Sequence, residues 1–289
     1  MKALVFGANG QDGFYLAQSL RARGIQCVGV DRCGDMLHGD VADYTFVRNI
    51  IAEHSPAYIF HLAARSTTHH DALFENHAAI STGSLNILEG VHQEHLPSRV
   101  LLCGSGVQFQ NFGTPISEET PFAATSPYAV ARIHSVFAAR YYRTLGVRAY
   151  VAYLFHHESP KRPPDQLSQR IVRTARRIRD GSSDVLDIGD LSVEKEWTFA
   201  GDVVNGMLAL LEQDAVFEAV IGSGETHSIQ EWVSTCFALA GLDWTKHVRQ
   251  REGFVPEYTR LCSNPALIRG LGWRPGVSFT DLAAMMMHS

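Results

Sequence analysis

Short apolar runs alternate with longer segments of mixed polarity through the first half of the chain. The apolar runs are continuous, which is typical of strands buried on both faces of a sheet. They cover residues 2–6, 26–30, 58–62, 99–103 and 148–154, with another short strand ending at 39–41. Between them, apolar positions three and four residues apart predict helices over 14–23, 44–54, 75–95 and 127–145. This alternation predicts an α/β fold: a Rossmann-like, doubly wound parallel sheet with helices on both faces.

The pattern changes after residue 155. A polar, proline-rich connection over 156–164 leads into a basic helix over 167–180. We expect later helices to begin at Asp202, at the capping box Ser228–Glu231, at Asn264 and at Ser278. The chain is therefore divided into a domain of residues 1–155 and a smaller, mostly helical lobe of residues 156–289, which interleaves with late strands of the sheet.

Composition narrows the range of functions. No apolar run approaches the roughly 20 residues of a membrane span, and the chain leads from Met1 straight into a strand, so neither a membrane protein nor a signal peptide is expected. A net charge of −5 argues against binding to nucleic acid. The five cysteines are scattered and form no C-x-x-C pair, which favours reduced thiols and a cytoplasmic location. The histidines have no ligand-like spacing, so no metal site is expected.

A glycine-rich turn follows the first predicted strand and precedes the first predicted helix. Gly7 permits a sharp turn, Gly10 permits close approach of a pyrophosphate, and Gly13 permits close packing of the helix on the strand. Free N–H groups at the helix start then face the anion. We therefore expect a bound dinucleotide on the turn residues Gly7, Asn9, Gly10, Gln11, Asp12 and Gly13.

The rest of the predicted cofactor site lies at the ends of later strands. Asp31 stands where an acidic residue binds the ribose 2′-hydroxyl of NAD, whereas Arg32 next to it favours the 2′-phosphate of NADP. We expect NAD on Asp31, with NADP as the alternative. The remaining predicted cofactor contacts are Asp40 and Val41 near the adenine, the small-residue loop Leu62, Ala63 and Ala64, and Leu154 at the end of its strand.

Three residues form a candidate group for proton transfer. Ser105 follows the strand over 99–103, and Tyr128 and Arg132 are four residues apart, on one face of a helix. A cation one turn away favours the phenolate form of a tyrosine, which otherwise exchanges protons poorly at neutral pH. Ser105 would bind the reacting oxygen, and Tyr128 would pass the proton while the nicotinamide passes the hydride. The contact of Tyr128 and Arg132 with the nicotinamide part of the cofactor is implied by the family resemblance described next.

At these residues the chain resembles the extended short-chain dehydrogenases/reductases, and among them the GDP-mannose 4,6-dehydratase and GDP-4-keto-6-deoxymannose reductase group. The resemblance covers nearly the whole length and rests on residues 7–13, 126–132, 154–162, 196–202, 224–228 and 271–275. It implies that residues 1–155 bind the dinucleotide and that 156–289 bind a GDP-sugar, or another nucleotide-diphosphate sugar. The substrate contacts that it implies are Ser66, His156, His157, Glu158, Lys161, Arg162, Lys195, Trp197 and Glu257. It also implies a homodimer or homotetramer paired through the helices over 75–95 and 127–145.

Three departures from the family pattern bear on the reaction. Arg132 stands in place of the usual lysine, and His156 in place of the usual asparagine. Val107 stands where the dehydratases carry the glutamate that removes the C5 proton of the sugar, and Glu118 and Glu119 belong to a later loop. The sequence therefore favours an NAD(P)-dependent reductase acting at C4 of the sugar, because that chemistry needs Ser105 and Tyr128 but no carboxylate. The alternatives are a dehydratase with a relocated base and a non-catalytic nucleotide-sugar-binding protein.

Overall fold

A seven-stranded sheet lies at the centre of the computed structural model, which describes all residues from 1 to 289. Its strands all pair in parallel, in the order β11-β6-β5-β4-β1-β2-β3. They are β1 (Lys2–Phe6), β2 (Gln26–Asp31), β3 (Leu37–His38), β4 (Tyr58–His61), β5 (Arg99–Ser105), β6 (Arg148–Leu154) and β11 (Glu218–Ile221). The predicted doubly wound sheet is thereby confirmed. The strand order reverses between β1 and β4, which opens a crevice at their carboxyl ends.

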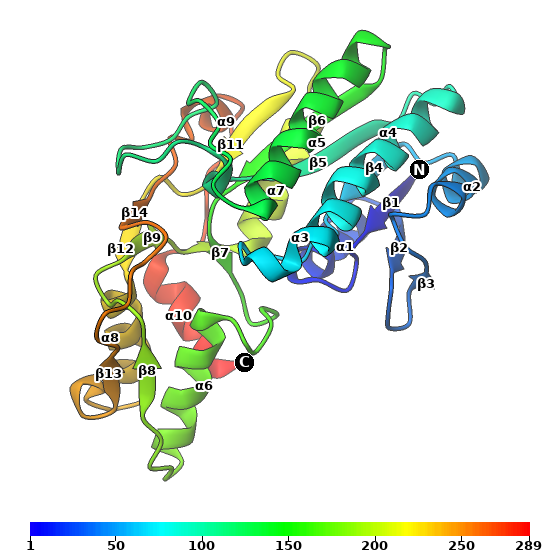
Figure 1. Ribbon diagram of the computed structural model, residues 1–289. Helices are drawn as coiled ribbons and strands as arrows, with labels where there is room; N and C mark the ends of the chain where they lie inside the picture. The colour runs from blue at the N-terminus through cyan, green and yellow to red at the C-terminus, as the bar shows by residue number, and fades with distance from the viewer.

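Helices cover both faces of this sheet (Figure 1). On one face, α2 (Tyr44–His54), α4 (Gly83–Gln93) and α5 (Pro127–Thr144) bury apolar side chains such as Ile51, Ile87 and Val136 against the strands. On the other face, α1 (Gln11–Ala22), α7 (Ala200–Leu211) and α9 (Ala266–Gly270) pack Leu16, Met207 and Ile268 against it. Strands buried from both sides explain the continuous apolar runs of the sequence.

Three expected elements differ in detail. The helix expected over 75–95 is a succession of α3 (Leu73–Asn76), the π-helical segment η2 (His77–Thr82) and α4. The strand expected to end at 39–41 is β3, which ends at His38. Asp202 does not cap α7: it lies in the first turn, and its carboxylate accepts hydrogen bonds of 2.9 Å from the N–H groups of Gly276 and Val277.

The smaller lobe packs three helices around a second apolar core. The helices are α6 (Leu167–Arg179), α8 (Ile229–Leu239) and α10 (Phe279–His288), with Trp232 and Phe237 fully buried among them. Ser228 and Glu231 form the predicted capping box at the start of α8, and Ser278 caps α10. The lobe also holds three short sheets built from β7 (His157–Glu158), β8 (Leu186–Ile188), β9 (Glu194–Glu196), β10 (Thr198–Phe199), β12 (Thr226–Ser228), β13 (Val248–Gln250) and β14 (Arg260–Leu261). Single 3-10 turns are η1 (His70–Ala72), η3 (Gly106–Gln108) and η4 (Trp244–Lys246).

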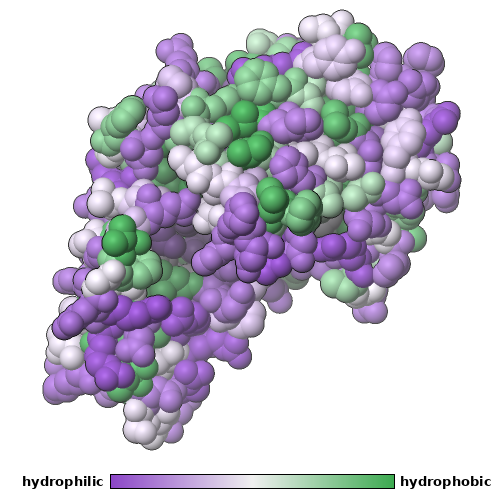
Figure 2. Space-filling view, in the orientation of Figure 1, coloured by the Kyte–Doolittle hydropathy of each residue, from purple (hydrophilic) through white to green (hydrophobic).

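The chain crosses between the two parts more than once. After α6 and the strands β8 to β10, the segment containing α7 and β11 joins the large sheet, and α8 then returns to the lobe. Figure 2 shows a largely hydrophilic surface that is hollowed where the larger part meets the lobe. No helix has both the length and the apolar character needed to cross a membrane.

Candidate active site

A cavity of about 950 Å³ lies at the carboxyl ends of β1, β4, β5 and β6 and is closed by segments of the lobe. It brings together residues that are far apart in sequence, from the first turn of the chain to the loop before β14. Sixteen of the residues predicted for the site line it: Gly7, Gly10, Gln11, Asp12, Gly13, Leu62, Ala64, Ser66, Ser105, Tyr128, Arg132, Leu154, His156, His157, Arg162 and Glu257. The cavity is therefore the candidate active site.

The glycine turn is as tightly packed as a phosphate-binding turn needs to be. Gly7 has a φ of +83°, and a β-carbon there would lie 2.6 Å from the backbone nitrogen of Ala63. A β-carbon on Gly13 would lie 2.4 Å from the carbonyl oxygen of Ala8. Helix α1 begins at Gln11, three residues earlier than expected, and no side chain caps it. Its first N–H groups are therefore free to bind an anion, so the residues present fit the pyrophosphate of a dinucleotide.

The predicted adenosine contacts lie beside this turn, outside the cavity wall. Asp31 ends β2, and its carboxylate accepts hydrogen bonds from the N–H groups of Asn9 (3.2 Å) and Arg32 (2.8 Å). Asp40 accepts a hydrogen bond of 2.9 Å from the N–H of Ala42. Asp31 thus stabilises the glycine turn through its hydrogen bond with Asn9. It also lies at the end of β2, where the sequence predicts a contact with the cofactor ribose. Asn9, Asp31, Arg32, Asp40, Val41 and Ala63 do not line the cavity, and their cofactor contacts stay predictions.

The structure brings Ser105, Tyr128 and Arg132, the candidate group for proton transfer, together at one cavity. Ser105 is the last residue of β5, and Tyr128 stands in the first turn of α5, whose cap Ser126 accepts a hydrogen bond of 3.1 Å from Ala129. The guanidinium carbon of Arg132 lies 5.0 Å from the centre of the Tyr128 ring. Arg132 is buried, and its Nη1 donates a hydrogen bond of 2.6 Å to the carbonyl oxygen of Cys103. The arginine fork therefore anchors α5 to the end of β5 while holding a positive charge beside the phenol.

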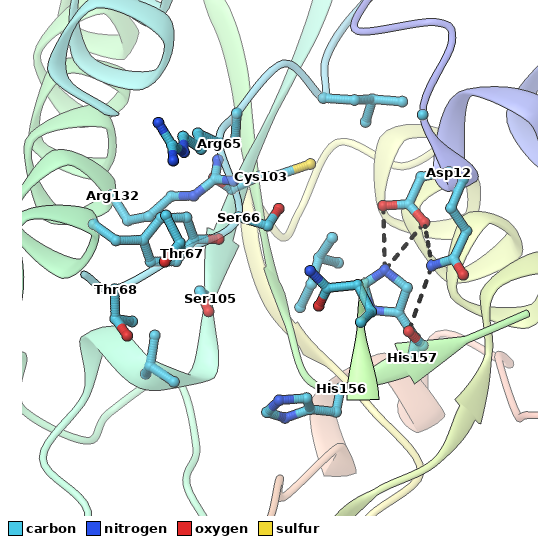
Figure 3. A pocket seen from close by; sticks show the side chains of 18 of the residues that line it. Asp12, Arg65, Ser66, Thr67, Thr68, Cys103, Ser105, Arg132, His156 and His157 are labelled. Atoms are coloured by element: carbon cyan, nitrogen blue, oxygen red, sulfur yellow. Dashed lines mark hydrogen bonds and ion pairs between the residues drawn. The ribbon is translucent and has the colours of Figure 1, made fainter. Parts of the chain in front are cut away.

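Asp12 and His157 form an ion pair on the opposite side of the cavity (Figure 3). The His157 Nε2 atom lies 3.0 and 3.2 Å from the two carboxylate oxygens of Asp12. Burial acts to lower the pKa of His157, but Asp12 outweighs it and the pKa lies above its usual value. Burial likewise acts to raise the pKa of Asp12, and His157 brings it below its usual value. Both groups are thus charged near pH 6, and the pair ties β7 to the first turn of α1.

A second set of buried charges lies behind the cavity wall. Glu158 is 2% exposed and accepts a hydrogen bond of 2.6 Å from the hydroxyl of Ser168. Arg162 Nε lies 3.4 Å and Lys195 Nζ 3.8 Å from its carboxylate oxygens. Burial lowers the pKa of Lys195, and Glu158 opposes this effect. Of these residues only Arg162 lines the cavity, so Glu158 and Lys195 support it from behind.

Two other predicted substrate residues pack elsewhere. Lys161 places its ammonium 4.6 Å from the ring centre of Phe14, on the surface. Trp197 stacks on Trp232 with a centroid separation of 4.4 Å and donates a hydrogen bond to the carbonyl oxygen of His227. Trp197 therefore belongs to the core of the lobe. Glu158, Lys161, Lys195 and Trp197 do not line the cavity.

His156, the second residue after the end of β6, lines the cavity. Its Nε2 atom lies 3.2 Å from the hydroxyl of Tyr258, and Nδ1 makes no hydrogen bond within the chain. Burial, followed by the positive charges of Lys195 and Arg162, holds the pKa of His156 well below its usual value. His156 is therefore a neutral imidazole at pH 7.

Sequence reasoning missed part of the cavity wall. The polar segment after β4 contributes Arg65, Thr67, Thr68, His69 and Asp71, and the segment after β13 contributes Tyr258. Thr68 donates a hydrogen bond of 3.2 Å to Glu257, which joins these two segments across the cavity. The run of polar residues directly after Ser66 was the available signal for the first segment, because strand ends at a switch point bind ligands.

No carboxylate takes the place beside Ser105. Val107 lines the cavity there, and the Glu118 carboxylate is held at β11, where it accepts a hydrogen bond of 2.7 Å from the N–H of Val220. Nor does the chain group three or more of histidine, cysteine, aspartate and glutamate as a metal would require.

Comparison with known proteins gives a consistent result. The family model of GDP-mannose 4,6 dehydratase matches residues 33–286. The chain belongs to the GDP-mannose 4,6-dehydratase family. GDP-mannose 4,6 dehydratase 1 of Arabidopsis thaliana is 29% identical over 99% of this chain and 88% of its own length. The chain is thus an enzyme of the extended short-chain dehydrogenase/reductase class, as the sequence motifs predicted, and the non-catalytic alternative loses its support.

Solved structures share the fold of this family member. UDP-glucose 4-epimerase of Thermus thermophilus, in complex with NAD, has a TM-score of 0.86 and 20% identity, covering 100% of this chain and 98% of its own. RMD from Pseudomonas aeruginosa, complexed with NADPH, has a TM-score of 0.87 and 20% identity over 99% of this chain and 97% of its own. At this level of identity the likeness establishes the sheet and the lobe, and it leaves the substrate to other arguments.

Proposed function

We propose that this protein is an NAD(P)-dependent enzyme that acts on a GDP-linked hexose and carries out 4,6-dehydration. The observation that carries the proposal is that the phosphate turn, Tyr128 and Arg162 lie around one cavity in a chain of this family. The family relation supports the dehydratase, which the sequence offered as an alternative, better than the reductase that it favoured. The proposal therefore differs from the first expectation.

The cofactor would lie with its pyrophosphate on Gly10 and the start of α1, and with its nicotinamide near Tyr128 and Leu154. A bound nicotinamide supplies hydride acceptance and return. We propose NAD because Asp31 can accept a hydrogen bond from a ribose hydroxyl, and its charge repels a 2′-phosphate. Arg32 keeps NADP as the alternative.

Two residues would handle the proton at the sugar C4 oxygen. The deprotonated oxygen of Tyr128 would accept the hydroxyl proton as C4 is oxidised, and Ser105 would donate a hydrogen bond to the C4 oxygen as it becomes a carbonyl. Arg132 would stabilise the phenolate through its charge, 5.0 Å from the ring centre. On the other side of the cavity, Arg162 would pair with the nucleotide diphosphate, because a guanidinium binds phosphate oxygens in a bidentate manner.

A second candidate is a reductase acting on a 4-keto-6-deoxy sugar. The specific observation in its favour is Val107, an apolar side chain on the cavity wall beside Ser105, where proton removal from carbon would need a base. A reductase needs no such base.

One assay separates the two reactions. Purified protein is incubated with GDP-mannose and either NAD or NADP, and the products are analysed by mass spectrometry. A dehydratase gives a GDP-sugar lighter by one water with no net cofactor consumption. A reductase leaves GDP-mannose unchanged and oxidises NADH or NADPH only when a 4-keto nucleotide sugar is added. If neither reaction occurs with GDP-, UDP- or dTDP-sugars, the proposed function is wrong.

We also propose that subunits pair through α4 and α5. Apolar side chains exposed on or beside these helices include Phe74, Leu85, Val130, Phe137 and Tyr141, and Figure 2 shows apolar groups on this part of the surface. Sedimentation should show a dimer or tetramer, and Phe137→Glu should shift it toward monomer. A cytoplasmic location is proposed with it, because all five cysteines are unpaired.

A further inference from the structure

Dehydration requires a base that removes the C5 proton of a 4-keto sugar, and the wall beside Ser105 offers only valine. We propose that His156 is this base and that Tyr258 orients its ring. The inference rests on the proposed function, since only a dehydratase needs the step. It assigns the relocated base to the segment that follows β6, the strand that pairs with β5 at Ser105.

The position of His156 follows from the register of the sheet. Ser105 pairs with Leu154 at the ends of β5 and β6. A β-carbon on Gly106 would lie 2.9 Å from the Phe155 ring, so the two chains stay adjacent past the last pair. His156 is the next residue, and it lines the same cavity as Ser105 and Tyr128. Figure 3 shows Ser105 and His156 on neighbouring segments of the wall, with the Asp12–His157 pair to one side.

The other bases of the cavity are less suited to the role. Asp12 is already engaged in its ion pair with His157 at the phosphate turn. Four further groups are exposed to solvent at the rim: His69, Asp71, Asp165 and Glu257. Apart from Tyr128, which is assigned to the C4 oxygen, His156 is a half-buried base of the cavity wall that is not paired with a carboxylate.

The Tyr258 hydroxyl lies 3.2 Å from Nε2 of His156 and can accept a hydrogen bond from Nε2–H. In the tautomer that we propose for catalysis, Nε2 carries the proton and the lone pair of Nδ1 is free to accept another. Burial raises the pKa of Tyr258, so the phenol stays neutral and cannot take the proton itself at pH 7. Tyr258 belongs to the segment that also carries Glu257, and both residues line the cavity.

The charges around His156 would make its pKa depend on whether substrate is bound. His156 is faced by Lys195, Arg162, His157 and Tyr258, and the positive charges of Lys195 and Arg162, with that of His157 when it is protonated, act on its imidazole. These charges oppose protonation of His156 in the free protein. A nucleotide diphosphate paired with Arg162 would offset them, which raises the pKa of His156 and makes it a stronger base when the sugar is bound.

The step balances without any further reactant. Nδ1 of His156 takes the proton from C5 of the 4-keto sugar, and the electron pair of that C–H bond becomes the C5=C6 double bond. The C6–O bond breaks with its electron pair on oxygen. The departing hydroxide takes the proton from the imidazolium and leaves as water, which returns His156 to its neutral form.

The test follows exchange at carbon rather than turnover alone. Wild-type protein with GDP-mannose and NAD in D₂O should incorporate deuterium at C5 of the product. His156→Asn, which keeps a hydrogen-bonding side chain but no base, should lower both exchange and product formation about 100-fold or more. GDP binding measured by calorimetry should change little. His288→Asn, at an exposed histidine near the end of α10, is the matched control and should behave as wild type.

A rescue variant and a spectroscopic readout guard against a merely structural effect. Val107→Glu in the His156→Asn background should restore C5 exchange by supplying a carboxylate beside Ser105. In the protein without cofactor, the NMR signal that His156→Asn removes should titrate below pH 6.5, and addition of GDP should move its pKa upward.

The outcomes distinguish this inference from the proposed function. If wild type dehydrates GDP-mannose and His156→Asn does so within threefold of it, His156 is not the base. Loss of exchange in Glu257→Gln together with retention in His156→Asn would overturn it in favour of Glu257. If wild type reduces a 4-keto sugar and never exchanges C5, the inference is wrong and the reductase stands. If wild type does neither, the proposed function has failed.

Discussion

The two sides of the cavity wall are built differently. On the sheet side, the wall consists largely of backbone atoms and small residues, such as Gly7, Gly10 and the N–H groups that begin α1. On the lobe side they are buried charges, with Arg162 at the wall and Glu158 and Lys195 behind it. On the sheet side, a substitution is restricted by the space available for a larger side chain. On the lobe side, it is restricted by the need to keep the buried charges paired. Substitutions should therefore fail for different reasons on the two sides, and the predictions below test that difference.

The largest effect is expected on the sheet side, at Tyr128 in the first turn of α5. Tyr128→Phe removes the proposed proton acceptor for the C4 oxygen and leaves the packing of α5 intact, so turnover of the proposed GDP-sugar substrate should fall about 10²- to 10⁴-fold. Steady-state kinetics should show the loss in kcat, with cofactor and GDP affinities within a fewfold of wild type. Activity close to wild type would remove Tyr128 from the mechanism.

The charged side should break when one buried partner is lost. Lys195→Met leaves Glu158 with one cation fewer in a site from which water is excluded, so the free energy of unfolding should fall by about 3 kcal/mol. Urea denaturation measures the change. Lys161→Met is the control, because Lys161 is exposed on Phe14 and should cost less than about 0.5 kcal/mol. Equal losses of unfolding free energy in Lys195→Met and Lys161→Met would mean that the buried ion pairs on the lobe side contribute no more stability than an exposed lysine.

On the sheet side, a larger side chain in the glycine turn should reduce stability because no space is available for it. Gly7→Ala forces a methyl group against Ala63, at a residue whose φ of +83° disfavours any side chain. We expect a loss of about 1–3 kcal/mol in stability and a matching weakening of cofactor binding. Thermal unfolding and fluorescence titration with NADH report the two effects. Gly24→Ala is a matched control with φ +70° and no atom within 4 Å, which isolates backbone strain from crowding.

The ion pair that joins the two sides should give the stability a pH dependence. The raised pKa of His157 means that its contribution is complete below pH 6.5 and is lost as pH rises through the folded-state pKa. The lowered pKa of Asp12 means that its contribution is lost at acid pH. Asp12→Asn should therefore abolish the decline in the free energy of unfolding as pH rises above 6.5, measured by urea denaturation at a series of pH values. Glu231→Gln, which alters the exposed His227–Glu231 pair, should leave that decline unchanged.

The smallest effect is expected where charge is kept and only shape changes. Arg132→Lys keeps a cation beside Tyr128 but cannot reproduce the guanidinium fork that donates to the carbonyl oxygen of Cys103. We expect activity to fall by up to about tenfold, the equivalent of one hydrogen bond. A rise in activity would instead mark Arg132 as a degraded form of the usual lysine.

The sheet and the phosphate turn could be predicted from the order of residues alone. Strands buried on both faces need continuous apolar runs, and a turn that touches Ala63 and Ala8 needs glycine, so both leave a local pattern. The positions of Ser105, Tyr128 and Arg132 could be predicted for the same reason, because a strand end and a helix face are short-range features, and their roles stay predictions. The break of the expected helix over 75–95 was missed, since π-helical turns have no spacing of their own.

The choice of which charges face the ligand was made by the packing of distant segments. The sequence grouped Glu158, Lys161, Lys195 and Trp197 with the substrate, yet these residues support the wall, lie on the surface or fill the core of the lobe. It also could not pair Asp12 with His157 or bring Tyr258 to His156, because each pair joins segments more than 100 residues apart. Such contacts depend on how the lobe closes over the sheet, and no local pattern of side chains encodes that geometry.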